Sequence, residues 1–309
     1  MIRSIITIVS VALSLSTSIS QGSVLPNILW ITCEDISANI GCYGDSYAAT
    51  PNIDALAARG VRYSNAYATA PVCSPARSCI ATGIHAGSLG TQHLRRSVQI
   101  PAHVRCMSES LRKAGYYCTN NAKQDYQFRT PEGTWDESSK KAHWKNRPEG
   151  KPFFAIFNDT RTHQSKTRYI GADLKRVNES LPKTLRHDPA EAPLPPYYPD
   201  TLIIRENVAA YYNQISIMDQ TVGEHLKALD DAGVADNTIV FFYSDHGGGI
   251  PRGKRWLHYN GIRVPFIAYF PRKYRHLAPV EPGATCDQLV SFADLAPTML
   301  SILGLPIPK

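Results

Sequence analysis

Short apolar runs that alternate with helix-like segments constrain the fold of this chain more than any other feature. Five runs of strand length stand at residues 27–32, 116–120, 153–157, 237–243 and 264–270. Helical patterns stand at residues 52–59, 107–114, about 206–232 and 288–303. This alternation predicts an α/β fold with a mostly parallel, mixed sheet that carries helices on both faces.

Polar and charged residues follow the predicted strands at the points where the strands end. They are Glu34 and Asp35, Lys123, His163, and Asp245 with His246. Because ligands in such folds bind beyond the carboxyl ends of the strands, we expect these residues to converge on one site. Asp219, by contrast, interrupts the apolar face of the long predicted helix, and we favour a structural role for it. Residues 124–150 and 171–201 are rich in proline and charge, which predicts surface loops.

The N-terminus has the three-part pattern of a secretory signal peptide. Arg3 precedes an apolar stretch at residues 5–15, and small and polar residues follow it. That stretch is too short to span a membrane, and no other segment is long and apolar enough. The sequence therefore predicts a signal peptide at residues 1–22 and a catalytic domain at residues 23–309. It also predicts a periplasmic or secreted protein with no membrane span in the mature chain.

Charge and cysteine content narrow the range of partners. The formal net charge is +7, but the basic residues are spread along the chain and form no basic helix or nucleic-acid motif. We therefore expect no nucleic-acid partner and favour an anionic small molecule or glycan. Seven cysteines, an odd number in an exported protein, predict that at least one is unpaired or modified. The sequence leaves the pairing of the other six open.

The segment CSPAR at residues 73–77 carries the sharpest chemical signal in the chain. It matches C-x-P-x-R, the consensus motif of sulfatases in which the cysteine is oxidised to formylglycine. Further blocks that look like the same family stand at residues 26–35, 50–57, 244–247 and 253–265. Over nearly all of residues 26–305 the chain resembles the type I, formylglycine-dependent sulfatases of the alkaline phosphatase superfamily. The resemblance implies their fold. It also implies that a formylglycine-generating or an anaerobic sulfatase-maturating enzyme converts Cys73 to formylglycine (3-oxoalanine).

The resemblance further implies a site for one divalent cation. Its ligands would be Glu34, Asp35, Asp245, His246 and the modified Cys73. Carboxylates gathered at strand ends suit a hard cation, so Ca²⁺ is expected, with Mg²⁺ or Mn²⁺ as alternatives. Glu34 stands where the family usually has an aspartate, and His246 where it has asparagine or histidine. An imidazole suits calcium less well than a side-chain amide does.

The remaining catalytic roles are also implied by the resemblance. Hydrated formylglycine at position 73 would offer one hydroxyl that attacks sulfur and a second that expels sulfate. Arg77 would hold this diol, while Lys123 and Lys254 would place positive charge on the sulfate oxygens. His163 would protonate the leaving group as general acid. Asp125 stands where many sulfatases have a histidine, so a second basic group is in doubt there.

The segments at residues 31–37, 70–77 and 90–95 look most like bacterial relatives of the heparan N-sulfatases, also called N-sulfoglucosamine sulfohydrolases. This resemblance implies a sulfated glycan such as a heparan-type chain, or a small sulfated substrate. A phosphonate or phosphodiester hydrolase of the same superfamily is an alternative. The chain also ends where the family continues into a smaller C-terminal subdomain, so we expect a truncated catalytic domain. A second alternative is therefore an inactive fragment that binds glycans.

Overall fold

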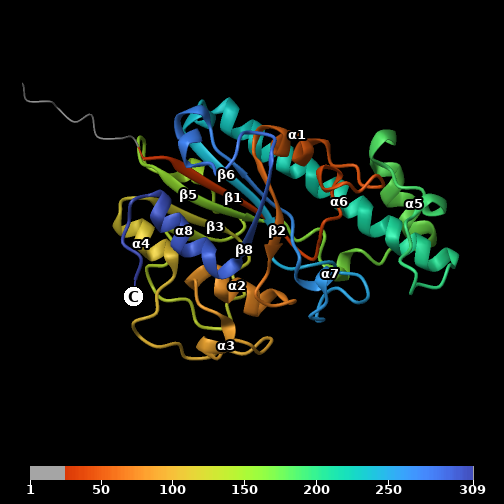
Figure 1. Ribbon diagram of the computed structural model, residues 1–309, viewed down its shortest axis with the longest axis horizontal. Helices are drawn as coiled ribbons and strands as arrows, with labels where there is room; N and C mark the ends of the chain where they lie inside the picture. The colour runs from red at the N-terminus through yellow and green to blue at the C-terminus, as the bar shows by residue number, and fades with distance from the viewer. Residues whose placement is uncertain (1–24, 309) are drawn as a thin grey trace, which may run out of the picture.

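An eight-stranded mixed sheet forms the centre of the computed structural model, which describes residues 25–308. The strand order is β4-β3-β5-β1-β6-β7-β2-β8, and Figure 1 shows helices on both sides of the sheet. The signal peptide predicted at residues 1–22 lies outside the described residues. The strands are β1 Asn27–Cys33, β2 Val61–Tyr67, β3 Tyr117–Asn121, β4 Glu137–Ser138, β5 Phe153–Asn158, β6 Thr238–Ser244, β7 Phe266–Tyr269 and β8 Thr285–Ser291.

Most neighbouring strands run parallel, as the sequence predicts. β1 pairs in parallel with β5 and β6, β3 pairs in parallel with β4 and β5, and β2 pairs in parallel with β8. Only β7 is antiparallel to its neighbours among the described strands, β6 on one side and β2 on the other. The prediction of a mostly parallel mixed sheet is therefore confirmed.

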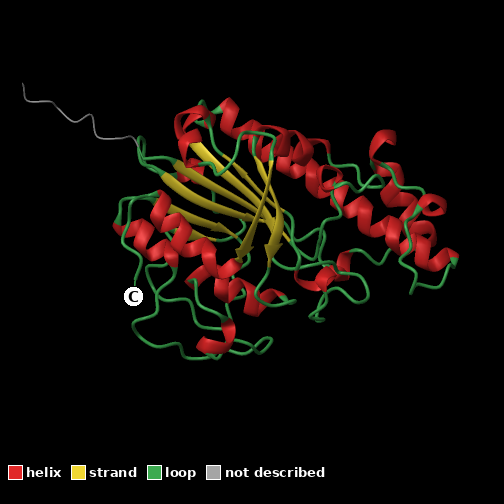
Figure 2. Cartoon of the chain, in the orientation of Figure 1, coloured by secondary structure: helices red, strands yellow, loops and turns green. Residues whose placement is uncertain are grey.

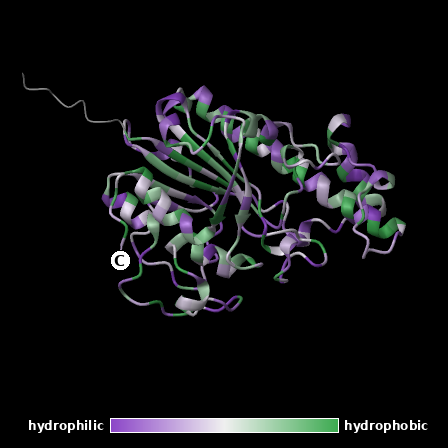
Figure 3. Ribbon diagram, viewed as in Figure 1, coloured by the Kyte–Doolittle hydropathy of each residue, from purple (hydrophilic) through white to green (hydrophobic). Residues whose placement is uncertain are grey.

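Helices cover both faces of this sheet (Figure 2), and the central strands β1 and β6 are buried along their whole length. The helices are α1 Pro51–Arg59, α2 Cys73–Thr82, α3 Ala86–Leu89, α4 Met107–Lys113, α5 Gly171–Ser180, α6 Leu202–Asp231, α7 Tyr259–Ile262 and α8 Leu295–Ile302. Alternate residues of β1 divide the core. Ile28 and Trp30 pack with α2, α4 and α8, whereas Leu29 and Ile31 pack with α1 and α6. Figure 3 shows hydrophobic residues along the strands and more hydrophilic ones on the outer helices.

The sequence placed the five predicted strands and three of the four predicted helices close to their observed bounds. The helix predicted at residues 288–303 is wrong in its first part, because β8 occupies Thr285–Ser291 and α8 begins only at Leu295. The β8 backbone bonds to β2, and Ser291 then closes a capping box with Asp294. The Ser291 amide donates to Asp294 Oδ2 at 2.8 Å, so a short helical turn starts there.

Two segments predicted as surface loops contain regular structure, and the strand β2 lies where no element was predicted. Residues 171–201 include the helix α5, whose Leu174 is buried against α6. Residues 124–150 include β4 and the fully buried Trp144, which stacks on Phe153. The strand β2 was missed, because five of its seven residues are partly exposed and its sequence has no continuous apolar run.

Asp219 has the structural role that the sequence favoured. It lies fully buried on α6, and its carboxylate accepts hydrogen bonds from the backbone amides of Asn52 and Ile53 at 3.2 and 2.8 Å. These amides belong to the first turn of α1, whose donors have no partner within the helix. Asp219 therefore joins α1 to α6. None of the helices within residues 25–308 combines the length and hydropathy needed to cross a bilayer.

Candidate active site

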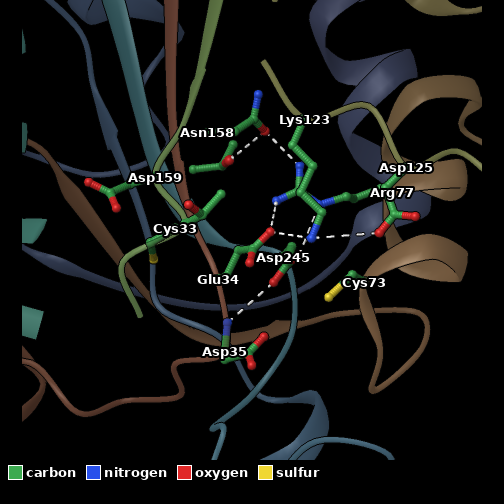
Figure 4. A network of polar contacts seen from close by, with 12 residues as sticks. Cys33, Glu34, Asp35, Cys73, Arg77, Lys123, Asp125, Asn158, Asp159 and Asp245 are labelled. Atoms are coloured by element: carbon green, nitrogen blue, oxygen red, sulfur yellow. Dashed lines mark hydrogen bonds and ion pairs between the residues drawn. The ribbon is translucent and has the colours of Figure 1, made fainter. Parts of the chain in front are cut away.

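Three adjacent parallel strands end at the same edge of the sheet and deliver the polar residues predicted to converge. Glu34 and Asp35 follow β1, and Asp245 follows β6, whose Ser244 is in register with Cys33. His163 lies five residues beyond the end of β5. Glu34, Asp35 and Asp245 are all at most 1% exposed. Figure 4 shows them clustered with Cys73, Arg77 and Lys123. We call this group the strand-end site.

Cys73 is the first residue of α2 and is buried, with 4% of its surface exposed. Its Sγ lies 3.2 Å from His246 Nε2 and 3.4 Å from Lys254 Nζ. The helix N-terminus adds the partial positive charge of its free backbone amides. Lys254 and the helix N-terminus thus place positive charge beside Cys73, while carboxylate oxygens of Asp35 and Asp245 lie within 4.8 Å of its Sγ.

Arg77 lies one helical turn after Cys73 and connects the acidic residues. Its Nε donates to Asp245 Oδ2 at 3.0 Å, and its Nη2 lies 3.4 Å from Glu34 Oε1. Nη1 donates to the Asn158 side-chain oxygen at 2.6 Å. Burial alone would lower the pKa of Arg77, but the charges of Asp245 and Glu34 keep it above its usual range. The guanidinium is thus a fixed cation beside Cys73.

Two lysines, predicted from the sequence, supply further positive charge. Lys254 Nζ lies 2.8 Å from both carboxylate oxygens of Asp35, and the side chain is buried. Lys123 Nζ donates to Glu34 Oε1 and lies 3.6 Å from Asp125 Oδ2. A close backbone approach fixes the loop before Lys254. A Cβ atom at Gly253 would lie 2.1 Å from the Gly248 carbonyl oxygen, so only glycine fits.

Four of the five predicted metal ligands form one compact group. Asp35, Cys73, Asp245 and His246 each offer a donor atom, and these atoms lie within 4.8 Å of one another. His246 Nε2 is 3.0 Å from Asp35 Oδ1 and 3.6 Å from Asp245 Oδ1. Burial disfavours the charged imidazole, but Asp245 and the hydrogen bonds to Asp35 and Cys73 raise the pKa of His246 well above its usual value. A proton on Nε2 therefore lies among the ligand atoms of Asp35, Cys73 and Asp245, at the place that a bound cation would take.

This donor set fits a divalent cation. It contains two carboxylates and an imidazole. Replacement of the Cys73 sulfur by an oxygen would make the set of ligands better suited to a hard cation. Glu34, the fifth predicted ligand, is in a second group with Asp35 and His163 and is paired with Arg77 and Lys123. Burial raises the pKa of Glu34, and Asp245 adds to this effect, while Arg77 and Lys123 oppose it.

His163 is at the rim of the site. It caps a short helical turn, and its Nδ1 lies 2.7 Å from the Ser165 hydroxyl and 3.3 Å from the Ser165 amide. Burial lowers the pKa of His163, although Asp35 opposes the shift. With Nδ1 engaged, Nε2 is the nitrogen that remains for a substrate. The next residue, Gln164, donates its backbone amide to Asp35 Oδ2 at 2.8 Å.

Asn158 was not predicted as a site residue. It ends β5, and its side-chain oxygen accepts bonds from Arg77 Nη1 at 2.6 Å and from the Thr32 hydroxyl at 3.0 Å. Its amide nitrogen donates to Asn120 Oδ1 at 3.0 Å. A signal was present, because a lone asparagine closes an apolar strand at the edge where the other polar residues gather.

Asp125 replaces the second basic group that many sulfatases have, and it bonds to α2. It accepts a hydrogen bond from the Ser74 hydroxyl at 2.6 Å, next to Cys73. All seven cysteines lie within residues 25–308, and each has a free thiol. The sequence prediction of at least one unpaired cysteine is met by Cys73, although the other six are unpaired too.

A mixed sheet with helices on both faces, and with cationic and acidic side chains at its strand ends, places the chain in the alkaline phosphatase-like class of α/β folds. Solved structures support this fold. A phosphonate monoester hydrolase from Silicibacter pomeroyi aligns with a TM-score of 0.70 at 18% identity, over 92% of this chain and 74% of that one. Within this class the chain belongs to the sulfatase family, whose sequence model matches residues 26–305.

Two curated relatives are similar in sequence. An ulvan-active sulfatase of Formosa agariphila is 42% identical over 90% of this chain and 52% of its own length. Human N-sulphoglucosamine sulphohydrolase is 27% identical over 92% of this chain and 62% of its own length. The chain therefore spans about half to two thirds of the length of these relatives. The resemblance to the sulfatase family is confirmed, and an N-sulphoglucosamine sulphohydrolase is among the relatives.

Proposed function

We propose that this protein hydrolyses sulfate groups, as esters or sulfamates, on a sulfated glycan. One observation carries the proposal. The Cys73 thiol, within a C-x-P-x-R motif, lies at a helix N-terminus 3.2 Å from His246 and 3.4 Å from Lys254, beside Asp35 and Asp245. An enzyme that transfers a sulfate group needs a nucleophile surrounded by fixed positive charge.

The residues around position 73 have separate proposed roles. Formylglycine there would supply, as its hydrate, a hydroxyl to attack sulfur and a second hydroxyl to expel sulfate and restore the aldehyde. Arg77, held by Asp245 and Asn158, orients that hydrate. Lys123 and Lys254 place positive charge on the sulfate oxygens, where negative charge grows in the transition state. His163 Nε2 gives a proton to the departing alcohol or amine.

A divalent cation, for which we propose Ca²⁺, completes the site. Asp35, Asp245, His246 and the modified Cys73 would hold it, with Glu34 as a further ligand that lies with Asp35 and His163. When bound, the cation would lower the pKa of the attacking hydroxyl and neutralise sulfate oxygens. His246 must then be a neutral ligand. Cation binding would therefore displace the imidazole proton that Asp35 and Asp245 stabilise in the cation-free protein.

The substrate class follows from the relatives. The Formosa agariphila relative is described as ulvan-active, and the human one as an N-sulphoglucosamine sulphohydrolase. We propose a sulfated polysaccharide or its fragments for this chain, with residues 23–309 as its catalytic domain. A signal peptide at residues 1–22 would send it to the periplasm or outside the cell, where such polymers are met.

Maturation and turnover test the proposal together. The chain is co-expressed with a formylglycine-generating enzyme, and intact mass spectrometry measures the replacement of the Cys73 thiol by an aldehyde. Turnover of an aryl sulfate and of a sulfated oligosaccharide is then measured. Cys73→Ala should lower both rates at least about a thousandfold. Cys79→Ala is the matched control, because Cys79 is a buried cysteine of the same helix that does not belong to the group of Asp35, Cys73, Asp245 and His246. Undiminished desulfation by Cys73→Ala would refute the proposal.

A phosphonate or phosphodiester hydrolase is the second candidate, favoured by His246 and by the fold shared with the Silicibacter pomeroyi enzyme. An imidazole ligand is better suited to a transition metal than to calcium. Matured protein that cleaves an aryl phosphonate monoester faster than the matching aryl sulfate would support it. Binding of a sulfated glycan without turnover, by protein with confirmed formylglycine, would instead identify a glycan-binding fragment.

A further inference from the structure

A groove of about 580 Å³ lies beside the strand-end site. Its walls come from residues 167–168, from residues 197–208 at the start of α6, and from residues 249–252. Gly249 belongs to both the groove and the site, because its backbone amide donates to the Asp35 carbonyl oxygen at 2.7 Å. Two residues after the groove wall ends, Lys254 bonds to the Asp35 carboxylate. A molecule that extends from Cys73 past Asp35 would therefore enter this groove.

An aromatic and cationic platform stands in the groove. The Arg252 guanidinium lies 4.4 Å from the centre of the Tyr197 ring, and both side chains are exposed to solvent. Tyr198 supports the platform by donating from its hydroxyl to the Pro251 carbonyl oxygen at 3.2 Å. Arg252 has a φ of 62°, a left-handed conformation that non-glycine residues adopt mainly at turns and functional sites.

The charge of the groove is of one sign. Arg168 and Arg252 line it, and no aspartate or glutamate does. Within residues 25–308 neither arginine has a carboxylate partner. The nearby Asp200 is already paired with Arg205 at 2.6 Å. Two unpaired guanidinium groups next to apolar and aromatic walls suit a ligand that has both a carbon–hydrogen face and an anionic group.

We propose that this groove is a subsite for an anionic sugar residue of the glycan, adjacent to the residue whose sulfate reaches Cys73. The sugar would lie against Tyr197, and its carboxylate or sulfate would bond to Arg252 and Arg168. The identity of the ligand as a sulfated glycan rests on the proposed function. The groove would then select chains of two or more sugar residues over small sulfates.

The test separates the groove from the catalytic step. In matured protein, kcat/KM is measured for an aryl sulfate and for sulfated tetrasaccharides prepared from ulvan and from heparin. Arg252→Ala should lower the ratio of tetrasaccharide to aryl sulfate kcat/KM roughly tenfold, chiefly through KM, as expected for the loss of one charge-assisted bond. Arg272→Ala, which removes one exposed charge after β7, is the matched control and should leave the ratio unchanged.

A binding measurement gives a second readout that needs no turnover. Calorimetry on the Cys73→Ala chain should show roughly tenfold weaker tetrasaccharide binding when Arg252→Ala is added, with a smaller loss for Tyr197→Ala. Equal tetrasaccharide binding by the Arg252→Ala and Arg272→Ala variants, or a kcat/KM ratio that Arg252→Ala leaves unchanged, would overturn the subsite. If matured protein cleaves no sulfate but Arg252→Ala still weakens binding, the proposed function fails and the subsite stands. Loss of the Arg252 effect with carboxyl-reduced tetrasaccharide would show that the bound group is a carboxylate, and its persistence would show a sulfate.

Discussion

The strand-end site and the inner face of α6 both bury ionisable groups, but they satisfy them differently. At the strand ends, Asp35 and Asp245 are fully buried and face Lys254, Arg77 and His246. On α6, Asp219 is just as buried, yet its partners are backbone amides and the side chains of Asn52 and Gln220. Burial of a carboxylate therefore does not by itself mark a site. Convergence with fixed cations and with a nucleophile does.

The difference is one of free energy as well as geometry. Backbone amides and two amide side chains bond to Asp219, but no cationic group does, and burial raises its pKa. Asp35 and Asp245 instead lie close to each other, and only the surrounding positive groups keep both ionised. Although burial opposes it, His246 and Lys254 hold the pKa of Asp35 below its usual value, and His246 and Arg77 do so for Asp245. Such an arrangement is costly for folding and prepared for charge that develops during catalysis.

The same Asp→Asn change in each region, at Asp245 and at Asp219, should give the largest difference in activity. Asp245→Asn removes one of the two negative partners of Arg77 and a proposed cation ligand, so kcat/KM for an aryl sulfate should fall about a thousandfold or more. Asp219→Asn makes the same chemical change at the same burial. It should leave kcat/KM within about twofold once the folded fraction is measured. Equal losses of activity in the two variants would remove the distinction between the regions.

Asn158 and Asn213 allow the strand-end site and α6 to be compared through neutral side chains. Asn158→Ala frees Arg77 Nη1 from its 2.6 Å bond and should lower kcat about tenfold to a hundredfold, with little change in KM. Asn213, on α6, bonds to His187 at 2.9 Å, away from Cys73. Asn213→Ala should lower stability but leave kcat unchanged. If Asn158→Ala changes only the melting temperature, it is not a positioning residue.

The sequence predicted the sheet, the main helices and the residues that follow the strands, because these depend on local periodicity and on one topological rule. The family resemblance implied Cys73, Arg77, Lys123 and Lys254 together. In the structure Lys254 Nζ lies 3.4 Å from Cys73 Sγ, and Arg77 and Lys123 both pair with Glu34. The sequence did not predict Asn158 or the switch from β8 to α8, since these depend on pairing across the sheet. The Tyr197–Arg252 platform was missed for a related reason, since its two residues lie on separate loops.

Loss of the α1 cap should be the next largest effect, and it concerns stability alone. Asp219→Ala removes acceptors for the Asn52 and Ile53 amides, so the free energy of unfolding should fall by about 1 to 2 kcal/mol. Urea denaturation followed by circular dichroism measures this. Asp231→Ala, at the exposed end of α6 and paired only with Lys227 in the structure, is the control and should cost less than about 0.5 kcal/mol. A larger loss of stability in the control would contradict the assignment.

The smallest expected effect concerns His225, which lies on α6 with its ring stacked 4.0 Å from that of Phe157. Burial, with the charges of His143 and Arg161, lowers the pKa of His225 from 6.5 to about 4. Between these values the unfolded chain binds a proton that the native chain does not, so this histidine adds stability as pH rises. The contribution is complete above pH 6.5 and is lost as pH falls towards about 4.

His225→Gln should remove that dependence, because glutamine does not titrate. The difference in unfolding free energy between wild type and variant should then grow by about 1 kcal/mol from the lower to the upper pH, since His225 lines an open pocket where solvent screens the burial effect. Denaturation with a chelator present makes the measurement independent of any cation at the strand ends. His276→Gln, at an exposed histidine after β7, is the control variant. A slope of opposite sign for His225→Gln would mean that the native protein holds this ring charged, and α6 would then resemble the strand-end site after all.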